Sequence, residues 1–344
     1  MGVQLGDLVD PRNIAIKDLA GRKVAFDGNN ILYQFLSIIR GRDGQPLKDR
    51  EGRITSHLSG LLYRNANLLE AGIKIVYVFD GTPHKFKKKV LKQRTETRNR
   101  AKKEYKKALD EGDAEKARKF GQQSVVATQD IIEDAKELLS RMGIPCVQAP
   151  GEGEAQTAHM VKREDIWCAA SQDYDSLLYG APRYVRNLSV TGRRKLPGKN
   201  VYIKIEPELF EFQRVLSQLD VSREQLVDIG ILIGTDYNPD GIKGIGPKTA
   251  QKLIKEHGNI YEALEHIENV EFPHPVEEIR ELFLNPRITD DYNLEWSKPD
   301  TAAIIGFLCG KHDFSQSRVL SAIEKMNKGY SLTGQKTTLD RFFR

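Results

Sequence analysis

The chain has 344 residues, of which 39% are hydrophobic and 29% charged, and its formal net charge is only +5. This composition fits a globular protein with a large core, and no apolar run is long enough to span a membrane. The three cysteines are far apart and show no metal-binding spacing, and the first residues lack a secretion signal. We therefore expect a protein of a reducing interior compartment.

The first 80 residues alternate between helical and strand-like patterns. The spacing predicts a short helical entry over 3–19, a strand ending at Asp27, two amphipathic helices over 29–40 and 55–71, and a strand ending at Asp80. This order is typical of an α/β fold.

A strongly basic segment follows. Between Lys85 and Lys119, fifteen Lys or Arg stand against six Asp or Glu, a local balance of +9. The large apolar residues there form too narrow a stripe for core helices. One interpretation is a solvated, charged hairpin. The other, which we favour, is a helical arch that holds a polyanion, because Lys and Arg bind phosphates with release of counterions.

Acidic residues gather where predicted strands end and predicted helices begin: Asp27, Asp80, Glu152, Glu154, Asp173 and Asp175. Ligands of α/β sheets bind at the carboxyl ends of the strands, so these acids are expected at one rim. A single Asp at such a place is more often a turn or helix cap. Two carboxylates about 4 Å apart, however, repel by about 4 kcal/mol at an effective dielectric near 20. A set of six, without Cys or His, favours Mg²⁺ or Mn²⁺ as a counter-charge.

The next segment predicts a hairpin over 184–205 and helices over 207–219 and 222–233, and Asp236 adds a seventh acid. The turn GIKGIGPKTA follows directly. Glycines and a first-turn proline direct free N–H groups toward an anion. Placed between helices over 223–233 and 248–256, the turn predicts a helix-hairpin-helix that binds a duplex backbone without reading bases.

Helical patterns over 260–284 and 301–326 close the globular part, and the chain then becomes polar. Its end carries three apolar residues spaced as one helical turn: Leu339, Phe342 and Phe343. Exposed aromatic residues at a chain end indicate a peptide that docks in an apolar pocket of another protein.

Together, the segments MGVQLGDLV, KVAFDGNNILYQF, VYVFDGTPHKFK, APGEGEAQ, ASQDYDSLLYG, GTDYNPDGIKGIGPKTA and TTLDRFF closely resemble the archaeal and eukaryotic flap endonucleases of the XPG and Rad2 nuclease family. The resemblance covers essentially the whole chain. It implies a PIN-like or resolvase-like α/β core, with a mixed, mainly parallel central sheet flanked by helices. The resemblance also implies two main parts of the chain: one nuclease core over 1–326, and a flexible tail over 327–344 that contains a clamp-binding peptide at 336–344. Within the core, we expect an N-terminal nuclease region at about 1–98, an arch at about 82–130, an internal nuclease region at about 116–258 and C-terminal helices at 260–326. The helix-hairpin-helix, at about 223–257, would be part of the internal region.

The resemblance also implies roles for single residues. One Mg²⁺ would be held by Asp27, Asp80, Glu152 and Glu154, and a second by Asp173, Asp175 and Asp236, with Mn²⁺ able to substitute. Lys87 and Arg94 would contact the scissile phosphate and act with Asp173 and Asp175 in catalysis. The Gly2 amino terminus would lie close to the site. DNA would be contacted by Tyr33, which stacks on a base, and by Lys85, Lys88, Lys89, Gly244, Gly246, Lys248 and Thr249, with K⁺ at the hairpin. Leu339, Phe342 and Phe343 would anchor the tail to the sliding clamp, although Lys336 stands at the usual Gln position.

The expected function is a structure-specific 5′ flap endonuclease with 5′–3′ exonuclease activity, acting by two-metal hydrolysis on branched DNA in replication and repair. The expected partner is the sliding clamp (proliferating cell nuclear antigen), and we expect a monomer without membrane attachment, cytoplasmic in an archaeon or nuclear in a eukaryote. Within the family, 5′ exonucleases and junction-resolving enzymes are alternatives, but they usually carry long additional regions. A non-catalytic, clamp-associated scaffold would not need seven acids, and a small-molecule phosphatase would not need the arch and the hairpin.

Overall fold

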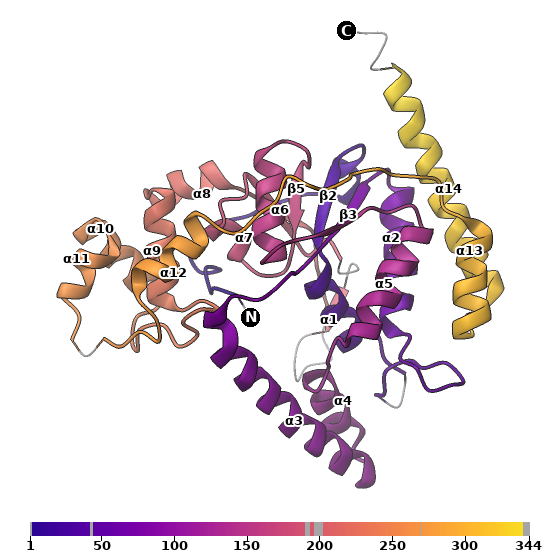
Figure 1. Ribbon diagram of the computed structural model, residues 1–344, viewed down its shortest axis with the longest axis horizontal. Helices are drawn as coiled ribbons and strands as arrows, with labels where there is room; N and C mark the ends of the chain where they lie inside the picture. The colour runs from indigo at the N-terminus through magenta and orange to yellow at the C-terminus, as the bar shows by residue number, and fades with distance from the viewer. Residues whose placement is uncertain (1, 42–43, 190–192, 196–201, 269, 340–344) are drawn as a thin grey trace. The chain divides into compact units, whose positions relative to one another are not determined.

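The computed structural model describes residues 2–41, 44–189, 193–195, 202–268 and 270–339 (Figure 1). By their internal contacts, the residues divide into two compact units. Unit 1 comprises Met1–Ala15, Asp80–Leu91 and Gln148–Asp291, and unit 2 comprises Ile16–Phe79, Lys92–Val147 and Tyr292–Arg344. Each unit is therefore assembled from segments far apart in the sequence.

The expected α/β class with a mixed, mainly parallel sheet is confirmed, and each unit contains a parallel pair of strands. In unit 2, β2 (Lys23–Asp27) runs parallel to β3 (Lys74–Phe79). Both strands are almost continuously apolar and buried, as is typical of parallel strands covered on both faces. The helices of unit 2 are α1 (Gly28–Ile38), α2 (Ser56–Glu70), α4 (Ala114–Gln123), α5 (Gln129–Arg141), α13 (Thr301–Ile305) and α14 (Gln316–Leu339). The short strand β4 (Cys146–Gln148) follows α5.

In unit 1, β5 (Cys168–Ala170) runs parallel to β6 (Arg183–Arg186), and β9 (Glu208–Glu211) runs antiparallel to both β6 and β1 (Arg12–Asn13). The helices of this unit are α6 (Gly153–Lys162), α7 (Asp175–Leu178), α8 (Phe212–Leu219), α9 (Arg223–Ile233), α10 (Pro247–His257), α11 (Ile260–Glu265) and α12 (Val276–Leu284). Two further strands, β7 (Arg193–Lys195) and β8 (Tyr202–Lys204), form a separate antiparallel pair within the predicted hairpin.

The predicted helix-hairpin-helix is present as α9, a glycine-rich turn and α10, which begins with Pro247. A buried ion pair fixes this region, because Arg280 of α12 donates to Asp228 of α9 at 2.6 Å. Asp228 also accepts a hydrogen bond from the N–H of Ile260 at the start of α11. Burial raises the pKa of the Asp228 carboxyl, and Arg280 opposes that shift. The pair thus links α12 to α9 and to the start of α11, which lie together at one end of Figure 1.

The basic segment forms two helices, α3 (Lys88–Asp110) and α4, which are preceded by a 3₁₀ turn, η2 (Lys85–Lys87). The predicted turn between the helices contains Gly112 at φ 70°. Asp113 then caps α4 by accepting a hydrogen bond from the N–H of Lys116 at 3.0 Å. In Figure 1 the two helices form a purple pair joined at its far end. The helices expected for an arch are therefore present.

Two predicted helices are wrong. Residues 3–19 contain only β1 and a 3₁₀ turn, η1 (Ile16–Leu19), and residues 207–219 begin as β9 before α8 starts. Both errors have one cause. β1 and β9 pair with each other, with Arg12 opposite Leu209, so long-range hydrogen bonding overrides the local pattern.

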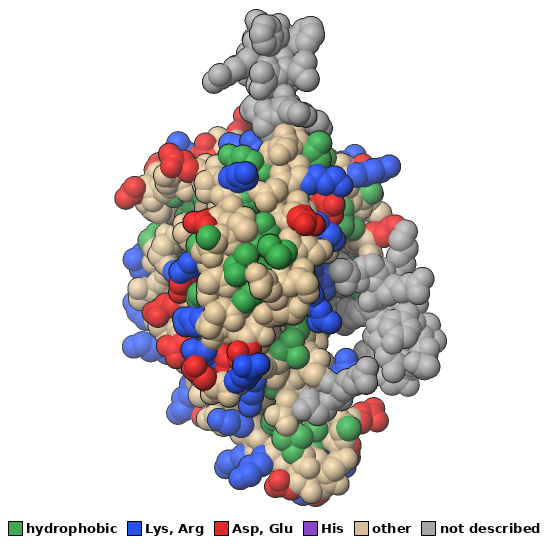
Figure 2. All heavy atoms as spheres, turned by 90° about the vertical axis from the view of Figure 1, so that its right-hand side faces the viewer, with side chains coloured by type: hydrophobic (Ala, Val, Ile, Leu, Met, Phe, Trp, Pro, Cys, Tyr) green, Lys and Arg blue, Asp and Glu red, His purple; other side chains and the backbone are tan. Residues whose placement is uncertain are grey.

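We expected a flexible tail from residue 327, but the C-terminal helix α14 continues to Leu339. Gly329 allows this helix to pack on α2, since an added Cβ would lie 1.8 Å from the carbonyl oxygen of Leu69. Leu320, Tyr330 and Leu332 are exposed on α14. Figure 2, which shows the side of the molecule that bears α14, has hydrophobic side chains interspersed with charged ones. Phe342 and Phe343 lie outside the described residues, as does the side chain of Leu339.

His57 of α2 is fully buried in unit 2, and neither ring nitrogen has a hydrogen-bond partner among the residues described. Burial lowers the pKa of the imidazole to about 4. The unfolded chain would bind a proton near pH 6.5, so stability is fully present above that pH and is lost as the pH falls toward 4.

We predict that between pH 7 and pH 4.5 the wild-type protein loses about 2 to 3 kcal/mol more unfolding free energy than His57→Leu, because the variant has no buried imidazole to protonate. Chemical denaturation at the two pH values measures the difference. The exposed His266, replaced in the same way, serves as the control. Equal losses in the wild type and in His57→Leu would contradict this assignment.

Candidate active site

Six of the seven predicted acids belong to unit 1. Asp80 follows β3, Asp173 and Asp175 follow β5, and Asp236 follows α9. Glu152 is the residue before α6, and Glu154 lies in its first turn. Five of these acids lie where a strand ends or a helix begins, whereas Asp236 follows the end of α9. At the start of α6 the helix dipole favours the negative charges of Glu152 and Glu154.

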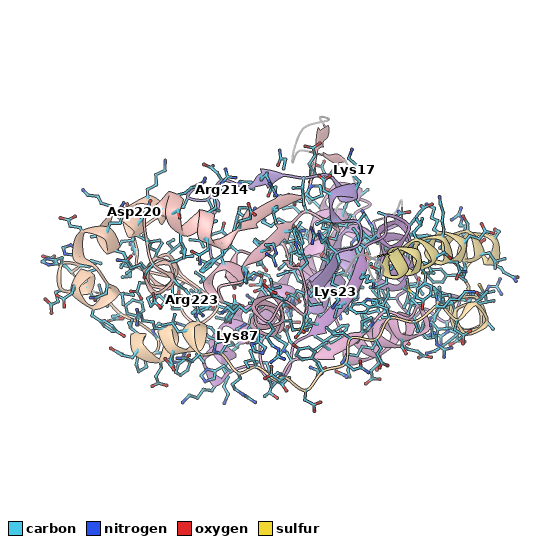
Figure 3. All side chains as sticks on the ribbon, turned by 90° about the horizontal axis from the view of Figure 1, so that it is seen from above. Lys17, Lys23, Lys87, Arg214, Asp220 and Arg223 are labelled. Atoms are coloured by element: carbon cyan, nitrogen blue, oxygen red, sulfur yellow. The ribbon has the colours of Figure 1, made fainter. Side chains whose placement is uncertain are left out.

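The ammonium group of Lys87 lies among these carboxylates. Its Nζ donates to Oε2 of Glu152 and lies 3.3 Å from Oδ2 of Asp236. The same Nζ lies 5.4 Å from the ring centroid of Tyr237, a geometry that allows a cation–π contact. Only 13% of the Lys87 side chain is exposed. Lys87, labelled in Figure 3, therefore provides positive charge where the carboxylates converge.

The ionisation of the acids shows how closely they interact. Burial and the nearby Asp236 raise the pKa of Asp175 to about 7. Burial also raises the pKa of Asp80 and of Glu152, and Lys87 opposes both shifts. For Lys87, burial works against the charge, but Glu152 and Asp236 outweigh it and raise the pKa of the ammonium group. The site therefore favours additional positive charge.

Three hydrogen bonds orient the acids. The N–H of Val3 donates to Oδ1 of Asp175 at 2.7 Å, and the N–H of Gly153 donates to Oδ1 of Asp80 at 2.7 Å. The hydroxyl of Ser171 donates to Oε1 of Glu154 at 2.8 Å. Sequence reasoning did not identify Val3 or Ser171, because Val3 is 172 positions from its partner and a lone serine carries no signal.

No group of three or more Asp, Glu, His or Cys side chains in the described ranges is arranged as a ready ion site. One reason is visible in unit 1, where the Lys87 ammonium group already contacts Glu152 and Asp236. The donor set nevertheless fits a hard divalent cation, because it consists only of carboxylate oxygens whose charges repel one another. Binding of an ion would replace contacts that Lys87 now makes.

Three of the residues predicted to hold metal or contact DNA belong to unit 2: Asp27, Tyr33 and Arg94. Asp27 ends β2 and also caps α1, accepting a hydrogen bond from the N–H of Asn30 at 3.0 Å. The guanidinium carbon of Arg98 lies 5.0 Å from the Tyr33 ring centroid, so Arg98 covers one face of the ring. Arg94 lies half-buried on α3.

The predicted DNA-binding residues of unit 1 are exposed: Lys85, Lys88, Lys89, Gly244, Gly246, Lys248 and Thr249. Gly244 has φ 86°, a conformation that favours glycine. A Cβ built on Gly244 or Gly246 would meet no atom within 4 Å, so an anion could approach this turn closely. The side chains of Lys248, Lys252 and Lys255 continue the basic face along α10.

Clustered carboxylates in unit 1 and the strongly basic helices α3 and α4 together indicate a metal-dependent enzyme that acts on phosphate esters. The comparisons identify the family. The XPG N-terminal domain matches residues 1–101, and the XPG I-region matches residues 143–236. The chain belongs to the flap endonuclease family, whose XPG nucleases are metal-dependent enzymes that hydrolyse DNA.

Similar proteins support this placement over the full length. Flap endonuclease 1 of Pyrococcus abyssi is 52% identical over 100% of this chain and 98% of its own, and that of Pyrococcus furiosus is 50% identical over all of both chains. The structure of flap endonuclease-1 from Methanococcus jannaschii is similar with a TM-score of 0.76 and 43% identity, over 97% of this chain and 100% of that one. The catalytic core of Rad2 in complex with a DNA substrate, 24% identical, shares the fold with a TM-score of 0.66 over 91% of this chain and 96% of that one.

The contact between Val3 and Asp175 leads to a prediction about Gly2. A Cβ built on Gly2 would lie 2.6 Å from Oδ1 of Asp175, so either the N-terminal segment or the carboxylate must move. We predict that Gly2→Ala lowers the cleavage rate about 10- to 100-fold while duplex binding is unchanged, because a misplacement of about 1 Å has an effect of that size.

Single-turnover cleavage and a separate binding titration measure the two effects. Gly6→Ala is the matched control, since its added Cβ meets the end of the Tyr174 side chain at 3.1 Å. A Gly2→Ala rate within about 2-fold of wild type would show that Asp175 is not held from the N-terminus.

Proposed function

We propose that this chain is a structure-specific 5′ flap endonuclease with 5′–3′ exonuclease activity, which hydrolyses phosphodiester bonds of branched DNA in replication and repair. The observation that carries the proposal is the convergence of Glu152, Asp236 and the buried Lys87 in unit 1, with Asp80 and Asp175 each close enough to Asp236 for its charge to raise their pKa. Full-length similarity to archaeal flap endonucleases supports the same reaction.

We further propose that the acids hold two Mg²⁺ ions, for which Mn²⁺ can substitute. The first set would be Asp27, Asp80, Glu152 and Glu154, and the second Asp173, Asp175 and Asp236. Bound ions would supply an activated water and would stabilise negative charge that develops on the phosphate. The chain's own contribution is orientation, since Ser171, Gly153 and Val3 fix three of the carboxylates before any ion or DNA arrives.

Lys87 and Arg94 are proposed to contact the scissile phosphate. Glu152 and Asp236 raise the pKa of Lys87, so its ammonium group stays protonated across the neutral range. A cation already desolvated beside the reacting bond stabilises charge more strongly than one in water. Lys87 thus functions as a fixed electrostatic group and does not need to transfer a proton.

DNA recognition is proposed to depend on shape. The basic helices α3 and α4 would hold the single-stranded 5′ flap, and Tyr33 would stack on a base near the junction. The exposed turn before α10, with K⁺ bound there, would hold the duplex through its phosphates, since Gly244 and Gly246 leave the backbone N–H groups approachable. Backbone contacts of this kind give specificity for structure over sequence.

The remaining proposals concern partners and location. We propose that Leu339, Phe342 and Phe343 anchor the chain to a sliding clamp, and that the protein acts as a monomer near the nucleoid in the cytoplasm. None of the described helices has the length and apolar character of a membrane-spanning segment.

We predict that Asp173→Ala and Asp175→Ala each lower Mg²⁺-dependent cleavage of a 5′ flap at least about 100-fold, because each variant removes a proposed ligand of the second ion. Cleavage products of one defined substrate are mapped to the nucleotide, and DNA binding is measured in Ca²⁺. Undiminished cleavage would remove these acids from the mechanism. Mapping also distinguishes flap, exonuclease and junction cleavage.

We predict that replacing Lys87 and Arg94 together by alanine lowers the single-turnover rate about 100- to 1,000-fold, because both cations are proposed to act in the transition state. Duplex affinity should fall by less than about 3-fold. Lys88 and Lys89, replaced together, provide the comparison, since they are exposed and should affect binding more than rate. A double variant that loses affinity but keeps its rate would assign Lys87 and Arg94 to binding alone.

A further inference from the structure

The η2 turn directs three successive side chains into different surroundings. A 3₁₀ helix has three residues per turn, so neighbouring side chains point about 120° apart. Lys85 is two-thirds exposed, Phe86 is only 6% exposed, and Lys87 reaches the carboxylates. The direction in which the Lys87 side chain points therefore depends on the direction in which the Phe86 side chain points, one residue earlier.

Phe86 is enclosed by two histidine rings. The His274 ring stacks on it with centroids 3.8 Å apart and planes 8° from parallel. The His84 ring meets it edge-on, at 4.6 Å and 89°. The backbone reinforces the turn, because the N–H of Lys87 donates to the carbonyl of His84 at 3.0 Å. The two histidine rings thus hold Phe86 in place, and the backbone hydrogen bond holds the turn that carries Lys87.

His274 is itself held by a stiff support. It stands between Pro273 and Pro275, whose rings fix their own φ and restrict the residue before each. Pro275 precedes α12, which the ion pair between Arg280 and Asp228 joins to α9. Near its other end, α12 packs Phe283 against the ring of Tyr237, the same ring over which Lys87 lies.

We propose that Phe86 and His274 are positioning residues for cleavage, and that their stack sets the place of the Lys87 ammonium group independently of the acids that it contacts. This inference rests on the proposed function of Lys87. Neither ring is proposed to touch the reacting atoms. Their effect passes through the η2 turn.

An independent support is needed because the charged partners of Lys87 are not permanent. Glu152 and Asp236 both belong to the proposed ligand sets, and an ion bound there competes with the ammonium group for the same oxygens. The stack between Phe86 and His274 involves no acid and is unaffected by that competition. It would keep Lys87 beside the site in every state of the reaction.

The test measures flap cleavage by Phe86→Ala, His274→Ala and His274→Phe. We expect kcat to fall about 10- to 100-fold for Phe86→Ala and about 10-fold for His274→Ala, with KM changed less than about 3-fold, because misplaced groups lower the rate more than binding. His274→Phe keeps a planar ring against Phe86 and should restore kcat to within about 2-fold of wild type.

Trp167→Leu is the control for loss of a half-buried aromatic ring in unit 1. Trp167 packs under the guanidinium of Arg183 at 5.2 Å and has no contact with the η2 turn among those described. The melting temperature of the Trp167→Leu variant should fall, and its kcat should stay unchanged. If kcat follows melting temperature across all four variants, or if His274→Phe is as slow as His274→Ala, the positioning role is refuted.

A second measurement needs neither metal nor DNA. In the metal-free protein, the rate of acetylation of each lysine is followed by mass spectrometry. Lys87 should be modified slowly in the wild type, because it is buried and ion-paired, and at least about 5-fold faster in Phe86→Ala and His274→Ala. Lys252, exposed on α10 in the same unit, is the internal reference and should be unchanged. An unchanged Lys87 rate in both variants would overturn the inference.

The two claims fail in different ways. If the wild-type protein shows no divalent-dependent flap cleavage, the proposed function fails, whatever the acetylation pattern. If the wild type cleaves normally, and the Phe86 and His274 variants match it in kcat and in Lys87 labelling, only the positioning role fails.

Discussion

The organisation of unit 1 depends on one electrostatic constraint. Carboxylates brought close together in a partly buried site repel one another by several kcal/mol unless positive charge lies among them. In this chain Lys87 provides that charge, in contact with Glu152 and 3.3 Å from Asp236. Burial and the nearby Asp236 still raise the pKa of Asp175 to about 7, so the one ammonium group does not offset the cost of bringing these carboxylates together. The remaining imbalance is what makes the site suited to divalent cations.

The rest of the unit can be understood as the scaffold that keeps these charges in place. The N-terminal segment supplies the N–H of Val3 to Asp175, the start of α6 supplies the N–H of Gly153 to Asp80, and Ser171 holds Glu154. Neutral donors can orient a carboxylate without neutralising it, so the cluster keeps its affinity for cations. The aromatic packing around η2 adds a support for the cation itself.

Much of this arrangement could be predicted from the sequence, and the reasons are physical. β2, β3, α9 and α10 were predicted nearly to the residue, because continuous apolar runs, caps and glycine-rich turns are local signals. β1 and β9 were missed, because their strand character depends on pairing with each other. The seven acids could be selected by their position at element ends. The contact of Val3 with Asp175 and the stack of Phe86 on His274 could not, because each joins residues whose types are common and whose separation exceeds 170 positions.

The most direct test of the central claim is anomalous diffraction from crystals of the protein soaked in Mn²⁺. We expect two ions within coordination distance of the carboxylates of Asp80, Glu152, Asp173, Asp175 and Asp236, and the Nζ of Lys87 moved away from at least one of its present partners. A structure in which Lys87 keeps both contacts, and in which the ions bind elsewhere or not at all, would contradict the claim that this cluster exists to hold divalent cations.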